Sequence, residues 1–354
     1  AGTNWVDKLL PPVVIGPVVA LIGLSLCGSA INNVNNTAAS PDGYNLVCIL
    51  IGIITFFATV LASVKGTKTM KLIPFIIGIA AGYAAASVFT VIGNKCGIDY
   101  LKIVDYSPLA NNFETVTFGS FISLPKFTFL GALNEGAGKI DVAAVVKLFA
   151  LFAPVAFVVF AEHIADHKNL GSIIDRDLIK DPGLPRTLLG DGLATTLAAL
   201  FGAPANTTYG ENTGVLALSR IYDPRVIRIA AVLAMCFSFS PKFAAIISSM
   251  PGGTIGGVSL VLYGMISAVG VRNVVENQVD FTKSRNVLIA ALILVLSIGI
   301  SYSKAGALTF GSVSLSGLAV GSLVGIVLNA VMPGKDYVFG QNPQGDESVN
   351  FIIQ

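Results

Sequence analysis

The sequence predicts an all-α protein that crosses a membrane many times, with one helix broken by a short extended segment. Hydrophobic residues make up 54% of the 354 residues, charged residues only 12%, and mean hydropathy is +0.77. Soluble domains carry about 25% charged residues. Apolar runs of about 20 residues, long enough to cross a bilayer, recur along the chain. Between two of these runs, Pro204 stands among Gly, Asn and Thr residues, a combination that interrupts a helix.

The composition also excludes several classes of protein. A chain this apolar suits neither a cytosolic enzyme nor a disordered segment. The net charge of +2 provides no basic field, so no nucleic-acid partner is expected. The cysteines have neither metal-ligand spacing nor the pattern of a disulfide framework, and no cofactor or metal is expected. They are Cys27, Cys48, Cys96 and Cys236.

About ten apolar crossings are expected, one of them interrupted. The stretch 93–141 is rich in Phe, Thr, Ser and Asn, which indicates a partly extended loop outside the membrane. Residues 333–354 form a polar tail. In chain order, the expected crossings are 13–31, 44–64, 72–92, 142–160, 188–201, the interrupted 202–221, 226–239, 255–271, 287–302 and 313–331.

Lysine and arginine in the short loops indicate the orientation, because cytoplasmic loops are enriched in both. Basic residues gather in 65–71, 168–186, 220–228 and 272–285, whereas 32–45 has none. These basic loops fall on one side of the membrane only if the interrupted segment crosses it. We therefore expect a multi-pass protein of the cell membrane with a cytoplasmic C-terminus.

Ionisable residues inside a membrane are costly and usually functional. The first cluster of them follows the fourth expected crossing and includes both histidines of the chain. Its members are Glu162, His163, Asp166 and His167. On a helix the two carboxylates, four residues apart, share a face. Either the span ends at Phe160 and these groups are interfacial, or the helix continues and places Glu162 near the membrane midplane. A zinc site on the histidines would need a third ligand.

The interrupted segment is the second candidate region. Residues 205–209 are expected to be extended, and a half-helix is expected to begin near Glu211. Secondary transporters build their sites from such broken helices at the midplane. Non-helical backbone survives in a membrane only inside protein or along a cavity. The alternative is an ordinary loop, which would put the basic residues 220–228 on the wrong side.

Asp191 is the third candidate, between two glycines near the start of the fifth expected crossing. A helix cap and a polar partner for a neighbouring helix are its two structural interpretations. A direct functional role is the remaining one.

Residues 211–220 closely resemble the signature motif of the nucleobase–ascorbate transporter family. That motif reads Gln or Glu, Asn, any residue, Gly, any four residues, Thr, and then a basic residue or Gly. Here the run is Glu-Asn-Thr-Gly-Val-Leu-Ala-Leu-Ser-Arg, which departs only at Ser219 and keeps the hydroxyl there. Nearly the whole chain takes part in the resemblance. Four further blocks look like bacterial uracil permeases in particular: 161–164, 181–184, 207–212 and 256–260.

The resemblance implies a secondary active transporter that couples nucleobase uptake to protons by alternating access. It implies fourteen spans in two inverted repeats of seven, of which this chain would lack about the first four. Implied partners are uracil or a related nucleobase, protons, the lipid bilayer and a second copy in a homodimer. By span order, the implied parts are gate spans five to seven in 1–100, an extracytoplasmic loop in 101–141, core spans eight to eleven in 142–250, gate spans twelve to fourteen in 251–332 and a cytoplasmic tail in 333–354.

The resemblance also implies roles for single residues. Glu162 matches the core-helix glutamate that hydrogen-bonds the base, and Glu211 matches the second ligand carboxylate. Tyr209 and Gly210 match the positions just before it, which contact the ring and offer backbone groups. Asp166 stands where a well-known uracil permease has histidine, which leaves the base and the proton-coupling residue open. Glu162 is the favoured proton-coupling group, followed by Asp166 and His163.

This chemistry is reasonable without the family. Uracil presents N–H donors and C=O acceptors, which carboxylates and backbone amides satisfy respectively. Each buried group left unpaired by a wrong ligand costs about 1–3 kcal/mol. A desolvated carboxylate also takes up a proton more readily.

Three alternatives compete with uracil transport. The first is a xanthine or uric acid symporter of the same family, disfavoured because many purine members have Gln where this chain has Glu211. The second is an anion transporter of the related sulfate and bicarbonate class, which the same carboxylate argues against. The third is a membrane enzyme using Glu162, His163 and His167, for which the sequence offers no reactive centre. We expect no enzyme activity.

Overall fold

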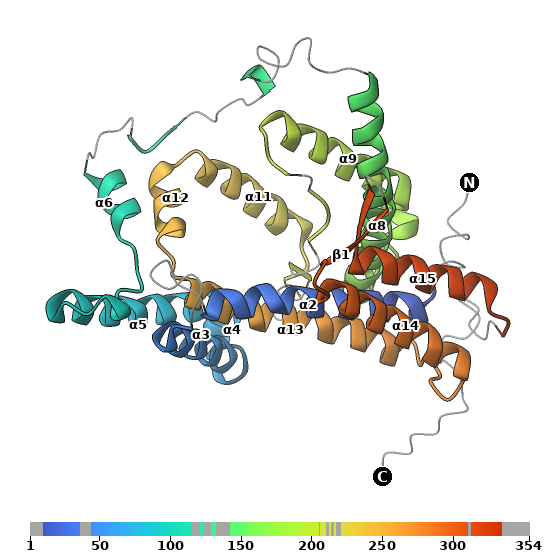
Figure 1. The fold of residues 1–354 in the computed structure, drawn as a ribbon, viewed down its shortest axis with the longest axis horizontal. Helices are drawn as coiled ribbons and strands as arrows, with labels where there is room; N and C mark the ends of the chain where they lie inside the picture. The colour runs from blue at the N-terminus through green and yellow to red at the C-terminus, as the bar shows by residue number, and fades with distance from the viewer. Residues whose placement is uncertain are drawn as a thin grey trace. The chain divides into compact units, whose positions relative to one another are not determined.

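The computed structural model describes residues 10–35, 44–114, 120–123, 129–131, 142–204, 206–209, 212–213, 216, 221–310 and 313–334. Helices dominate this part of the chain (Figure 1), in agreement with the predicted all-α class. The chain divides into two compact units. The first comprises Ala1–Ser25, Phe127–Gly214 and Met265–Gln354, and the second Leu26–Lys126 and Val215–Gly264. The helices α2 (Pro12–Asn35) and α13 (Gly252–Glu276) run through both.

The remaining elements each belong to one unit. Those of the first unit are α8 (Val142–Ile174), the helical turn η3 (Ile179–Gly183), α9 (Leu184–Leu200), α14 (Ser284–Ser301), β1 (Ala307–Phe310), β2 (Val313–Ser316) and α15 (Gly317–Val331). Those of the second unit are α3 (Leu46–Lys65), α4 (Lys68–Leu72), α5 (Pro74–Cys96), η1 (Asp99–Leu101), α6 (Ser107–Phe113), α11 (Pro224–Ser238) and α12 (Pro241–Ser248).

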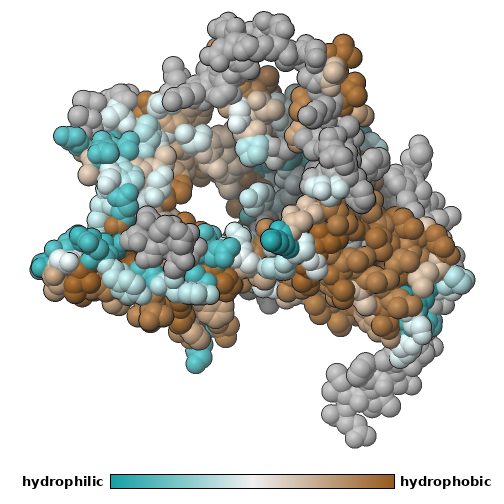
Figure 2. All heavy atoms as spheres, viewed as in Figure 1, coloured by the Kyte–Doolittle hydropathy of each residue, from teal (hydrophilic) through white to brown (hydrophobic). Residues whose placement is uncertain are grey.

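Several helices have the length and composition of membrane spans. Among the described residues, five helices qualify: α2, α3, α5, α13 and α14. The helices α11 and α12, bent by 94° at a short break, qualify together as a sixth candidate span. Apolar side chains cover the outer face of α14 and α15 (Figure 2), where Val287, Val295 and Val327 are exposed. The chain therefore has the character of a multi-pass membrane protein, while the expected number of ten crossings stays a prediction.

Small residues let α3 and α5 pack closely in the second unit. Gly78 and Gly82 are buried on α5 and face Thr59 and Thr55 of α3, so that an added Cβ would overlap a threonine hydroxyl. Thr55 Oγ1 donates to the Ile51 carbonyl, and Thr59 Oγ1 to the Thr55 carbonyl, each at 2.8 Å. Such stripes of small residues are typical of helix contacts in membranes.

The loop that follows α5 contains more regular structure than expected. The expected loop 93–141 includes η1 and α6 within its described part. Lys242, buried at the start of α12, donates to the Asn112 carbonyl at 2.7 Å and lies over the rings of Phe113 and Phe121. These contacts fix α6 against α12.

The last expected crossing, 313–331, is wrong at its start. Val313–Ser316 forms β2, which pairs antiparallel with β1, and the helix α15 begins only at Gly317. The reason is visible in the residues: Val313 and Leu315 alternate with serines, the period of a strand rather than of a helix. Ser297 of α14 then donates to the Gly317 carbonyl at 2.8 Å, which brings α14 and α15 together.

Candidate functional site

The ionisable cluster lies within one long helix. The helix α8 continues without a break to Ile174, so the helix does not end at Phe160, while an interfacial position of these groups and one near the midplane both stay predictions. Glu162 is part of this helix, but its side chain lies outside the described residues. Its depth in a membrane stays a prediction.

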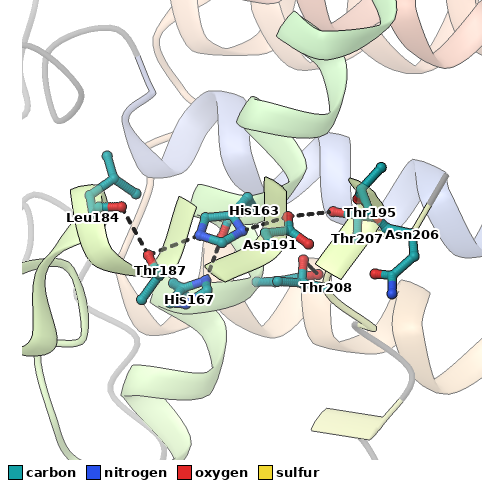
Figure 3. Close-up of polar contacts among 10 residues, drawn as sticks. His163, His167, Leu184, Thr187, Asp191, Thr195, Asn206, Thr207 and Thr208 are labelled. Atoms are coloured by element: carbon teal, nitrogen blue, oxygen red, sulfur yellow. Dashed lines mark hydrogen bonds and ion pairs between the residues drawn. The ribbon is translucent and has the colours of Figure 1, made fainter. Parts of the chain in front are cut away.

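Among the cluster residues whose side chains the structure describes, His163 is the most buried, with 1% of its surface exposed. Its Nε2 lies 3.0 Å from Thr187 Oγ1 and its Nδ1 lies 3.2 Å from Asp191 Oδ2, both on α9 (Figure 3). The His167 ring stacks on it at 4.1 Å, and His167 Nδ1 donates to the His163 carbonyl. His163 therefore joins α8 to α9 through both of its ring nitrogens.

Asp191 is the partner of a neighbouring helix and not a helix cap. The helix α9 begins at Leu184, two turns earlier, so the cap interpretation is wrong. Thr187, Asp191 and Thr195 are spaced by four and share one face of α9. All three side chains are half-buried and make hydrogen bonds beyond their own turn. Through this face, α9 makes hydrogen bonds to α8 and to the segment that follows α9.

The chain after α9 is non-helical, as predicted. Residues 203–204 and 206–209 have no helical or strand structure, which confirms the interruption for the described part of 202–221. Thr195 Oγ1 donates to the Asn206 carbonyl at 2.6 Å, and Thr207 Oγ1 donates to Asp191 Oδ2 at 3.2 Å. Thr208 Oγ1 donates to the buried Asp166 at 2.6 Å. Three consecutive residues are thus attached, the last to α8 and the other two to α9.

We name these contacts the polar seam. Its members are His163 and Asp166 of α8, Thr187, Asp191 and Thr195 of α9, and Asn206, Thr207 and Thr208 of the non-helical segment.

The remaining predicted site residues follow directly after the seam. The Tyr209 side chain is 69% exposed, and its carbonyl accepts from the Asn212 N–H at 3.2 Å. Gly210 and Glu211 lie outside the described residues, so the binding of one base by Glu162 and Glu211 stays a prediction. Within the described parts, no three His, Cys, Asp or Glu residues could hold a metal ion.

Four threonines of the seam were not predicted from the sequence as site residues: Thr187, Thr195, Thr207 and Thr208. A signal was present for the first two, which stand four residues before and after Asp191 in an otherwise mostly apolar helix. No spacing rule identifies the other two, because their partners lie on other elements.

Known proteins resemble almost the entire chain. A family model described as "Permease family" matches residues 1–306. The chain is 39% identical to a "Uracil permease" of Bacillus caldolyticus over 336 residues, 95% of this chain and 70% of that protein. It is 35% identical to a "Uracil permease" of Bacillus subtilis over 94% of this chain and 70% of that protein.

A "Uracil permease" of Escherichia coli K12 is also 35% identical, over 94% of this chain and 69% of its own length. These relatives are permeases and not enzymes, as expected for this chain. They confirm the family resemblance inferred from residues 211–220. By the extent of these matches, the chain belongs to the permease family.

Proposed function

We propose that this protein takes up uracil across the cell membrane, coupled to protons, by alternating access. The observation that carries the proposal is the match over about 95% of this chain to a relative named uracil permease. The motif at 211–220 supports it, because it follows directly after the non-helical segment that the polar seam holds.

The base is bound by two carboxylates and by backbone groups of the segment. Glu162 and Glu211 accept N–H groups of uracil, while Tyr209 contacts the ring and Gly210 offers its backbone. The contacts of Thr207 and Thr208 support this role, since fixed neighbours keep a binding backbone in one position. A base with a different pattern of donors leaves buried groups unpaired, at about 1–3 kcal/mol each.

The proton is carried by Glu162, with Asp166 and His163 as the next candidates. A carboxylate in an apolar environment takes up a proton readily and releases it when water reaches it.

We place the core domain in 142–250 and the gate domain in 1–100 and 251–332. The C-terminus is cytoplasmic in this proposal, and the assembly is a homodimer.

Uptake by the full-length protein in liposomes tests this proposal. Glu211→Gln should weaken uracil binding by about 1–3 kcal/mol, because a charge-assisted hydrogen bond becomes neutral. Glu162→Gln should abolish proton-driven accumulation, because an amide carries no proton, while exchange of bound for free uracil continues. Uptake of labelled uracil is measured with and without a proton gradient, in competition with xanthine.

Glu276→Gln is the matched control, since Glu276 is an exposed glutamate paired with Arg272 at the end of α13. It should behave as the unaltered protein. Stronger binding of xanthine than of uracil would show that the substrate is a purine and not uracil. Proton-driven accumulation by Glu162→Gln would remove that residue as the proton carrier.

A further inference from the structure

His163 and Asp191 lie at the centre of a series of hydrogen bonds that reaches Thr207 in the non-helical segment. From one end to the other, its members are the Leu184 carbonyl, Thr187, His163, Asp191 and Thr207 (Figure 3). The opposite face of α9 carries Leu189, Leu193 and Leu197, all exposed. The series of hydrogen bonds is therefore confined to one side of α9.

The donors and acceptors of this series can be assigned in order. The Thr187 hydroxyl has one hydrogen, which it donates to the Leu184 carbonyl at 3.1 Å. In this arrangement the Thr187 oxygen accepts, and we assign the hydrogen of the 3.0 Å contact to His163 Nε2. At the other end, Thr207 donates its hydroxyl hydrogen to Asp191 Oδ2.

A second hydrogen is then needed between His163 Nδ1 and Asp191 Oδ2, 3.2 Å apart. Two lone pairs would otherwise face each other. Either the ring carries both hydrogens and the carboxylate none, or each group carries one; both forms are neutral overall. The form with one hydrogen fewer leaves a net negative charge in a site where His163 is 1% exposed, which is costly.

Among the described residues, the structure shows no ion pair between the Asp191 carboxylate and a lysine or arginine; the cations nearest in sequence are Lys168, five residues after His163 on α8, and the exposed Arg186, next to Thr187 on α9. The titratable group stacked on His163 is His167, whose Nδ1 is engaged with the His163 carbonyl. Asp166, one turn along α8, is held by Thr208. By sequence, β2 and α15, which also pack against α8, have no titratable residue. Lys180 and Asp181 of η3 are exposed.

We propose that His163 and Asp191 share a proton as a buried positioning pair, which holds Thr207 and with it the segment that leads to the substrate carboxylate Glu211. The pair is distinct from the groups that touch the base. The part of this inference that concerns uracil rests on the proposed function, whereas the shared proton and the hold on the segment do not.

The shared proton is tested by magnetic resonance of the full-length protein with isotope-labelled histidine at neutral pH. The signal that disappears in His163→Gln identifies His163. We expect a hydrogen on Nε2 and a strongly deshielded hydrogen between Nδ1 and the carboxylate, which Asp191→Asn removes. A His163 ring without a hydrogen on Nε2 would overturn the shared proton.

The hold on the segment is tested with a cysteine at position 206, in a background without the four cysteines of this chain. Thr207→Val should raise the rate of maleimide labelling of that cysteine several-fold, because the segment opens more often. Thr207→Ser, which keeps the hydroxyl, and Thr196→Val should leave the rate unchanged. Thr196 is the matched control, since its hydroxyl donates to the Gly192 carbonyl of its own helix. Equal rates in Thr207→Val and the parent would overturn the positioning role.

Uracil affinity is measured on the same variants. Thr207→Val should weaken it about tenfold, the size of one lost hydrogen bond, and Thr207→Ser should restore it to within about twofold. Unaltered affinity in Thr207→Val would also overturn the positioning role. If the unaltered protein binds no uracil while the labelling difference persists, the proposed function fails and the positioning pair stands.

Discussion

Threonine serves different purposes in the α3–α5 interface and in the polar seam. In the interface, Thr55 and Thr59 are fully buried and donate to carbonyl groups of their own helix. In the seam, Thr207 and Thr208 of the non-helical segment donate to carboxylates on two helices, α9 and α8. The first arrangement satisfies a polar group locally, whereas the second makes the position of one element depend on another.

The difference explains how one membrane protein combines rigid and responsive contacts. Helices that meet through glycine and self-satisfied threonine are held by close packing, which changes little when charges change. Elements that meet through His163, Asp166 and Asp191 are held by groups whose hydrogen bonds depend on protons. Substitutions that change packing should therefore lower the free energy of unfolding most in the α3–α5 interface. Substitutions that remove a hydrogen bond should lower it most in the polar seam.

The largest effect is expected from overpacking the interface. In Gly82→Val, the new Cβ overlaps Thr55 Oγ1 and approaches Thr254 Oγ1, which should cost about 3 kcal/mol in the free energy of unfolding. Denaturant titration in detergent measures it. Gly264→Val in α13 is the matched control, because no atom outside its own turn lies near the added Cβ. A loss of similar size in the control would show that valine itself, and not the overlap, is responsible.

An intermediate effect is expected from Thr208→Val in the seam. The variant removes a 2.6 Å hydrogen bond to Asp166, whose surface is only 7% exposed. Hydrogen bonds to charged groups contribute about 1.5–3 kcal/mol, so the free energy of unfolding should fall by about 2 kcal/mol. The same titration of Thr208→Ser should give nearly the value of the unaltered protein. If serine and valine cost the same, the hydroxyl is not the group that matters.

The helical part of this fold could largely be predicted from hydropathy. The expected crossings 13–31, 44–64 and 72–92 correspond to α2, α3 and α5 within a few residues, because continuous apolar runs specify buried or lipid-facing helices. The hairpin of β1 and β2 was missed, since an apolar window averages over the alternation at 313–316. The helix α12 was missed too, although Ser240 followed by Pro241 is a helix start signal that the structure uses.

The candidate site was predictable only in part. Glu162, His163, Asp166 and Asp191 could be selected because ionisable groups are rare in apolar surroundings. The pairing of His163 with Asp191 could not be predicted, because it depends on how η3 places α9 against α8. The bonds of Thr207 and Thr208 depend in the same way on the path of a non-helical segment, which follows no period.

The smallest effect is expected from Thr55→Val in the interface, and it sharpens the comparison with Thr208→Val. Thr55 has no exposed surface, and its hydroxyl donates to the Ile51 carbonyl. That carbonyl keeps its backbone donor in the helix, and the two side chains have almost the same shape. Replacing a locally bonded hydroxyl by a methyl group is then nearly neutral, at about 0.5 kcal/mol or less in the same titration. A loss as large as that of Thr208→Val would mean that the Thr55 hydroxyl acts across the α3–α5 interface, and the contrast between the two regions would not hold.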